Sequence, residues 1–253
     1  MRFWKRHNLP SRVGLTKMSV LPSKFEFFED TYISVAAKMI LKHKVPSDLV
    51  YGQDEINAQF LSRPNKIKAI EGAKRIRLLG VRSEKLKIIV TFTLKETGDV
   101  VGIHQIIFAG RTKRCEPQST APANTSYDHT DSLWQTPKCY INYLQKVVIP
   151  DKEATIARLN LPLDQKAIVV HDLHYSHKDT NILEFMEEDN LLSLYIPAGC
   201  TDIMQTTDTV ANIPFKVGLK APFQDYLFVE YNKWISLNPD KETIGQWYPK
   251  TIY

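Results

Sequence analysis

The sequence predicts an α/β domain with a mixed sheet, in which an antiparallel hairpin is joined to parallel strands and helices flank the sheet. Three patterns lead to this expectation: a strand–helix–strand unit with an acid after its first strand, a second apolar run that ends on an acid, and a β-rich hairpin. Their bounds are residues 167–208, 47–54 and 86–108.

The strand–helix–strand unit begins with the apolar run 167–171, which ends at Asp172. Ligands of open α/β sheets gather outside the carboxyl ends of the strands, so Asp172 is placed where chemistry is expected. The run 47–54 ends in the same way at Asp54. If these two strands lie side by side, the two acids meet.

The remaining elements follow from periodicity and from proline positions. Helical spacing of apolar residues predicts a helix over 24–43, and Thr136 followed by a proline predicts a capped helix to about Val148. A third helix is expected to be interrupted or kinked at two prolines. The two prolines are Pro214 and Pro222. Pro, Ser and Thr content predicts a loop over 116–131, and polar composition predicts a connection over 151–166.

Composition fits an ordinary soluble globular protein. Hydrophobic residues make up 43% of the 253 residues and charged residues 24%, which argues against general disorder. The net charge of +5 permits a polyanionic partner without requiring one. The three cysteines are too few and too widely spaced for a disulfide framework or a zinc-spaced pair. The cysteine pattern indicates a reducing compartment. No apolar run reaches membrane-spanning length, and the first residues lack the apolar core of a signal peptide, so a soluble intracellular protein is expected.

Three acids are the candidate catalytic and metal-binding residues: Asp54, Asp172 and Asp208. Carboxylate oxygens suit Mg²⁺ or Mn²⁺, and three acids converging on one point would need bound cations to offset their repulsion. Two such ions can activate an attacking oxygen and stabilise a leaving oxygen in phosphoryl transfer. Asp202 is an alternative for the third acid. The plainer alternative is that these acids are solvated or cap helices.

Two other readings stay open. His171, His174 and His177 flank the second acid and suggest a zinc hydrolase, although their spacing is not that of a known helical zinc motif. The basic run from Glu71 to Lys87 is either a solvated face or a nucleic-acid contact.

A series of motifs in this order resembles the DDE-type transposases of the pogo, Tigger and jerky group, relatives of mariner transposases and of centromere protein B. The motifs are Gln53-Asp54-Glu55, Ile106–Cys115, Val170-His171-Asp172, Tyr195–Asp208 and Asn212–Lys216. The resemblance implies an RNase H-like catalytic domain over 21–235. It also implies that 1–20 is the end of a helix-turn-helix DNA-binding module with its linker, while 236–253 is expected to be a loose tail.

The same resemblance implies an activity. Asp54, Asp172 and Asp208 would form a D, D, D triad that holds two divalent ions, cuts DNA and joins a 3′-hydroxyl to target DNA. Expected partners are DNA and a second copy of the chain, in the nucleus. Basic residues expected to contact phosphates are Lys74, Arg75, Arg77, Arg111, Lys113 and Arg114. The competing hypothesis is a domesticated or decayed transposase relic that binds DNA in the nucleus without catalysis.

Overall fold

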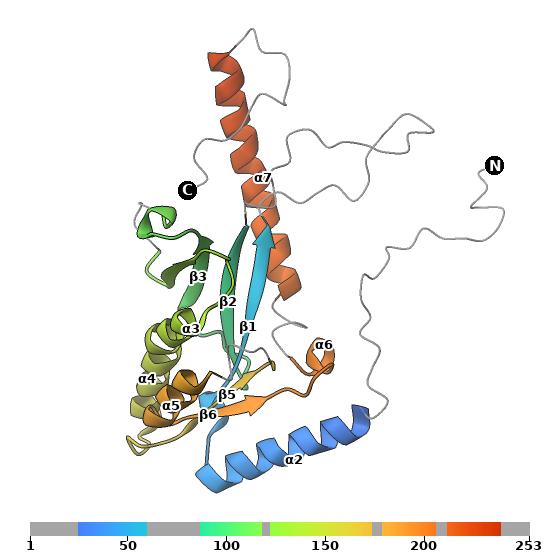
Figure 1. The fold of residues 1–253 in the computed structure, drawn as a ribbon, viewed down its shortest axis with the longest axis vertical. Coiled ribbons are helices and arrows are strands. Elements are labelled where there is room, and N and C mark those ends of the chain that lie inside the picture. Colours follow the sequence, from blue (N-terminus) through green and yellow to red (C-terminus); the bar gives the residue numbers. More distant parts are fainter. Residues whose placement is uncertain (1–24, 60–86, 118–121, 174–178, 206–211, 239–253) are drawn as a thin grey trace, which may run out of the picture.

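A six-stranded mixed sheet forms the centre of the computed structural model, which describes residues 25–59, 87–117, 122–173, 179–205 and 212–238 (Figure 1). The strand order is β4-β3-β2-β1-β5-β6. The strands are β1 (Val50–Gln59), β2 (Lys87–Lys95), β3 (His104–Ala109), β4 (Thr125–Thr130), β5 (Ala167–His171) and β6 (Leu191–Tyr195).

Among the strands that the structure describes, β2 alone runs against the direction of its neighbours. It pairs antiparallel with both β1 and β3, whereas the β1–β5, β5–β6 and β3–β4 pairs are parallel. The predicted hairpin is therefore present as β2 and β3, and its turn is closed by a bridge between Leu94 and Val100. Parallel strands need crossover connections, which explains why β5 is reached only through a helical segment.

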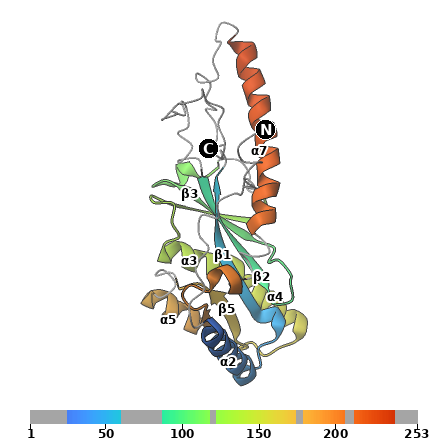
Figure 2. The same cartoon turned by 90° about the vertical axis from the view of Figure 1, so that its right-hand side faces the viewer.

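Helices cover the two faces of the sheet differently (Figure 2). One face carries the main core, into which four helical segments place buried side chains. The other face receives α7 (Asn212–Leu237), which continues beyond the sheet. The four helical segments of the main core are α3 (Pro137–Tyr143), the π-turn η4 (Leu144–Val148), α4 (Ile149–Leu159) and α5 (Thr180–Glu188).

Smaller elements complete the fold. Helix α2 (Phe25–His43) packs partly buried side chains against the main core, and no residue of α2 is fully buried. The short elements are η1 (Ser47–Leu49), η3 (Lys113–Cys115) and α6 (Thr201–Met204). In the described ranges no helix has the length and apolar character needed to cross a membrane.

Three sequence expectations about local structure were wrong. Residues 116–131 contain strand β4 rather than a continuous loop, because backbone pairing with β3 holds this polar segment extended. The helix that starts at Pro137 does not stop at Pro150, so the expected connection 151–166 is helical as far as Leu159. The helix passes through η4 into α4 and ends at Asn160, whose left-handed φ of 52° closes the helix. Helix α7 is not interrupted at its prolines: Pro214 lies in its first turn, and the helix runs through Pro222 as one element.

Candidate active site at strands β1 and β5

The parallel pairing of β1 with β5 determines where the first two predicted acids lie. Val50, Tyr51 and Gly52 pair with Ile168, Val169 and Val170 in a constant register. The same offset sets position 54 opposite position 172, just past the last residue of β5. Neighbouring strands are about 4.8 Å apart, so the two acids are anchored within reach of a shared ligand.

Asp54 lies in the middle of β1, not at its carboxyl end as the sequence predicts. Strand β1 continues to Gln59 because its other edge pairs with β2 along its full length. However, β5 stops at His171, so Asp54 lies where the parallel pairing ends. Asp54 pairs with Phe92 of β2, so the two side chains lie on the same face of the sheet. The ring centroids of Phe92 and of Phe215 in α7 are 4.7 Å apart. The half-buried Asp54 side chain therefore lies on the α7 face.

Both carboxylate oxygens of Asp54 are oriented by hydrogen bonds. The backbone N–H of Glu55 donates to Oδ1 at 2.9 Å, and Nδ2 of Asn212 donates to Oδ2 at 2.9 Å. An ionised carboxylate is an acceptor with about four lone-pair positions on its two oxygens. Hard oxygen donors of this kind fit Mg²⁺ or Mn²⁺.

The third predicted acid, Asp208, lies outside the described residues. The described residues on either side of its segment, Gln205 and Asn212, both bond to β1. Gln205 donates from Nε2 to the backbone oxygen of Gln53 at 3.1 Å, and both glutamines are buried. The alternative acid, Asp202, belongs to the short helix α6.

Behind the acids, His171 and Tyr140 form a buried pair. The Tyr140 hydroxyl and Nδ1 of His171 are 3.0 Å apart, and neither residue is exposed to solvent. Burial is the main cause that raises the pKa of Tyr140 well above its ordinary value. The neighbouring Tyr143 and Glu55 raise this pKa further, and so does Asp172. The charge of Asp172 is therefore close enough to act on the buried phenol.

The other predicted site residues are distributed differently. Lys74, Arg75 and Arg77, together with His174 and His177, lie outside the described residues. The other predicted basic residues, Arg111, Lys113 and Arg114, are not brought next to the acids. They follow β3, which β2 separates from β1. Of these three, Arg111 forms an exposed ion pair with Asp131 at 2.9 Å, while Lys113 and Arg114 are exposed on η3.

A zinc-type cluster is absent from the described part of the chain, where no group of three or more His, Cys, Asp or Glu side chains could hold a metal ion. His171 points into the core toward Tyr140. Among the three predicted histidines, it is the one that the structure describes.

Residues 83–243 match the sequence profile of the family described as DDE superfamily endonuclease, which is more than half of the chain. The chain belongs to this family. The matched region includes positions 172 and 208, and position 54 precedes it. No curated protein matches the chain.

Solved structures of Mos1 share the fold of this DDE endonuclease domain. The Mos1 mariner paired end complex with Mn is 13% identical, with a TM-score of 0.53 over 90% of this chain and 60% of the Mos1 chain. A pre-cleavage Mos1 transpososome is 12% identical, with a TM-score of 0.53 over 92% of this chain and 61% of that chain. The mixed sheet with flanking helices is thus the RNase H-like fold of a transposase catalytic domain, and the chain spans about 60% of the Mos1 chains.

Sequence reasoning missed the polar residues that support the acids in this DDE domain. Gln205 and Asn212 fell within the quoted motifs but were given no role, and the Tyr140–His171 pair was not foreseen. The available signal was that Gln205 and Asn212 bracket the third acid. Their partners on β1 are distant in the sequence, so the pairing itself has no local pattern.

Proposed function

We propose that this chain is the catalytic domain of a DDE transposase that cuts DNA strands and joins a 3′-hydroxyl to target DNA. Asp54, Asp172 and Asp208 are the acids that hold two divalent ions, Mg²⁺ or Mn²⁺. The observation that carries the proposal is the parallel β1–β5 register, which sets Asp54 opposite Asp172 in a family of endonucleases. Bound ions of this kind would polarise the phosphate and activate the attacking oxygen.

The assignment of Asp208 rests on its flanking residues. Gln205 and Asn212 attach the chain on either side of the 206–211 segment to Gln53 and Asp54. Two such attachments to adjacent residues of β1 limit how far the segment between them can extend from the strand, because the chain has a fixed reach per residue. This supports Asp208 over an acid elsewhere in the chain.

DNA is the proposed substrate. The similar Mos1 structures include a complex with a left transposon end, with a TM-score of 0.50, 12% identity and coverage of 96% of this chain and 63% of that chain. A net charge of +5 is compatible with a polyanionic substrate. The basic groups assigned to phosphate contacts remain Lys74, Arg75 and Arg77, with Arg111, Lys113 and Arg114. Replacing them with alanine should weaken DNA binding and reduce its dependence on salt.

A plasmid-nicking assay tests the catalytic part. The purified chain is incubated with supercoiled DNA and Mn²⁺ or Mg²⁺, beside the variants Asp54→Asn, Asp172→Asn and Asp208→Asn. Each variant should lose at least about a hundredfold in rate, because a neutral amide is a poor ligand for a hard cation. Asp164→Asn is the matched control, since Asp164 is an exposed acid that precedes β5, at the end of this strand opposite to Asp172.

The outcomes separate the enzyme from the relic. Nicking that needs the metal and all three acids, with Asp164→Asn unchanged, supports the catalytic domain. Equal residual nicking in the wild type and in Asp172→Asn would remove the catalytic claim. If such a protein still bound DNA, it would be the non-catalytic nuclear relic.

Two further parts of the proposal concern assembly and location. The chain is proposed to form a homodimer, which light scattering coupled to size exclusion measures directly. It is also proposed to act in the nucleus, which imaging of a fluorescent fusion checks. A monomeric mass at every concentration, or a fusion excluded from the nucleus, would contradict the respective part.

A further inference from the structure

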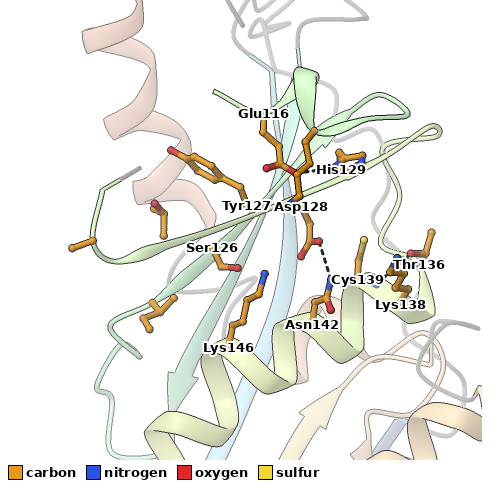
Figure 3. A pocket seen from close by; sticks show the side chains of 14 residues that line it. Glu116, Ser126, Tyr127, Asp128, His129, Thr136, Lys138, Cys139, Asn142 and Lys146 are labelled. Carbon is orange, nitrogen blue, oxygen red and sulfur yellow. Dashed lines mark hydrogen bonds and ion pairs between the residues drawn. The ribbon is translucent and has the colours of Figure 1, made fainter. Parts of the chain in front are cut away.

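A cavity of about 670 Å³ lies at the β4 edge of the sheet, opposite the β6 edge, between strand β4 and the helix formed by α3 and η4 (Figure 3). On the strand side, Ser126 and Asp128 face the helix, because Asn142 of α3 donates from Nδ2 to Oδ1 of Asp128 at 3.0 Å. Strand β4 is separated from β1 by β3 and β2, so this cavity is distinct from the acid site.

Ser126 provides a buried polar group without a partner. The residue is 8% exposed, and within the described ranges its Oγ has no hydrogen-bond partner. Ser126 is also one of the residues that line the cavity. A buried hydroxyl that makes no hydrogen bond is costly, so a ligand atom that bonds to it is favoured.

The helix presents two lysines to the same cavity. Lys138, Asn142 and Lys146 recur every four residues and all line it. Figure 3 shows the Lys146 side chain directed from the helix toward the strand. Lys146 belongs to the π-turn η4, a widened turn that is found frequently at functional sites.

A third lysine, Lys113 of η3, lines the cavity from the side of the β3–β4 connection. In the described part of the chain, none of the three lysines forms an ion pair with a carboxylate. All three are exposed, so their ammonium groups are available to an anion.

The two carboxylates of the cavity already have other partners. Glu116 accepts from Nδ1 of His129 at 2.6 Å. Asp128 accepts from Nε2 of Gln105 at 2.8 Å in addition to Asn142. The lysines outnumber these carboxylates, and the Ser126 hydroxyl shares the cavity with three ammonium groups. Hydroxyl and ammonium donors of this kind suit phosphate oxygens.

We propose that the cavity between β4 and α3 binds a phosphate group, with the Ser126 hydroxyl and Lys146 as its principal donors and Lys113 and Lys138 supplying further charge. The volume accommodates a ligand of nucleotide size. The phosphate comes from either a free nucleotide or a single-stranded nucleic acid. Because the cavity is remote from β1 and β5, this site does not depend on the catalytic proposal.

Calorimetric titration tests the site, with pyrophosphate, deoxyadenosine monophosphate and a single-stranded oligonucleotide as probes. All titrations use the full chain with Asp54→Asn and a metal chelator, so that the acids cannot bind phosphate through ions. In this background, Lys146→Gln should weaken binding about tenfold and Ser126→Ala severalfold. Lys42→Gln, which removes an exposed lysine of α2, should leave it unchanged.

The results also identify the source of the phosphate. Binding of the mononucleotide or pyrophosphate indicates a free ligand, whereas saturable binding of the oligonucleotide alone indicates a nucleic-acid strand. Circular dichroism checks that each variant is folded. The proposal is overturned if no probe binds saturably, or if Lys146→Gln and Ser126→Ala bind as tightly as their parent.

Discussion

The Tyr140–His171 pair gives a quantitative test of how the acid site is supported. Tyr140→Phe removes one oxygen atom and preserves the ring that packs against Tyr143. The lost contact is the 3.0 Å hydrogen bond to Nδ1 of His171, in a place where both residues are fully buried. The ring nitrogen cannot exchange this bond for one to bulk water.

The expected cost follows from that burial. Leaving a buried polar atom without its partner costs about 1–3 kcal/mol of unfolding free energy. Urea unfolding followed by circular dichroism measures this loss. In a chain of this size, each kcal/mol lowers Tm by roughly 2–4 °C, so thermal unfolding provides an independent reading.

Tyr32→Phe is the matched control for this experiment. Burial raises the pKa of Tyr32 to about 12, yet no hydrogen bond to its hydroxyl is present among the described residues. Its replacement should change stability by less than about 0.5 kcal/mol. If Tyr140→Phe and Tyr32→Phe had equal effects, the reasoning that the His171 contact supports the fold would be refuted.

Three further predictions concern an ion pair, the core and pH. Lys95→Met should destabilise the fold by about 3 kcal/mol, because Asp151, 2.6 Å from Lys95 Nζ, is left largely buried without its cation. Adding Asp151→Asn, which removes the charge and keeps an oxygen to accept from the Tyr51 hydroxyl, should recover most of that loss in urea unfolding. No recovery would contradict the pairing. Ile168→Ala should cost about 3 kcal/mol because Ile168 is fully buried in β5, whereas Leu163→Ala, at 92% exposure, should have almost no effect. Burial lowers the pKa of His104 below its ordinary 6.5, so the unfolded state takes up the proton first and unfolding free energy falls as pH drops through 6.5. Unfolding curves of His104→Gln should show a weaker decline, and identical slopes would disprove it.

The central strands could be predicted because buried strands leave apolar runs in the sequence. The buried run of β5 and the apolar start of β1 each lead to an acid, and β2 and β3 are β-rich runs on either side of a turn signal. Thr136 also behaves as its sequence indicates, since its side chain accepts from the N–H of Cys139 and caps α3. In these cases the deciding interactions are local or involve continuous apolar burial.

The failures have the opposite cause. Strand β4 is a polar edge strand, with two buried residues in six, and its conformation is imposed by β3. Pro150 indicates a helix end, but the preceding π-turn places it in the first turn of α4, where its missing N–H is not needed. The bonds from Gln205 and Asn212 to β1 depend on tertiary structure, and nothing in the nearby sequence encodes the partner.

The long-range pairing of β1 with β5 also affects the order in which the protein assembles. The β1–β2–β3 part forms from contacts between segments close in the chain, whereas β5 must wait until α3 and α4 have been synthesised and packed. Contacts between distant segments form late because loop closure precedes the gain in pairing energy. A nascent chain on the ribosome therefore has its hairpin scaffold before Asp54 and Asp172 meet, and the acid pair is completed only as the domain closes.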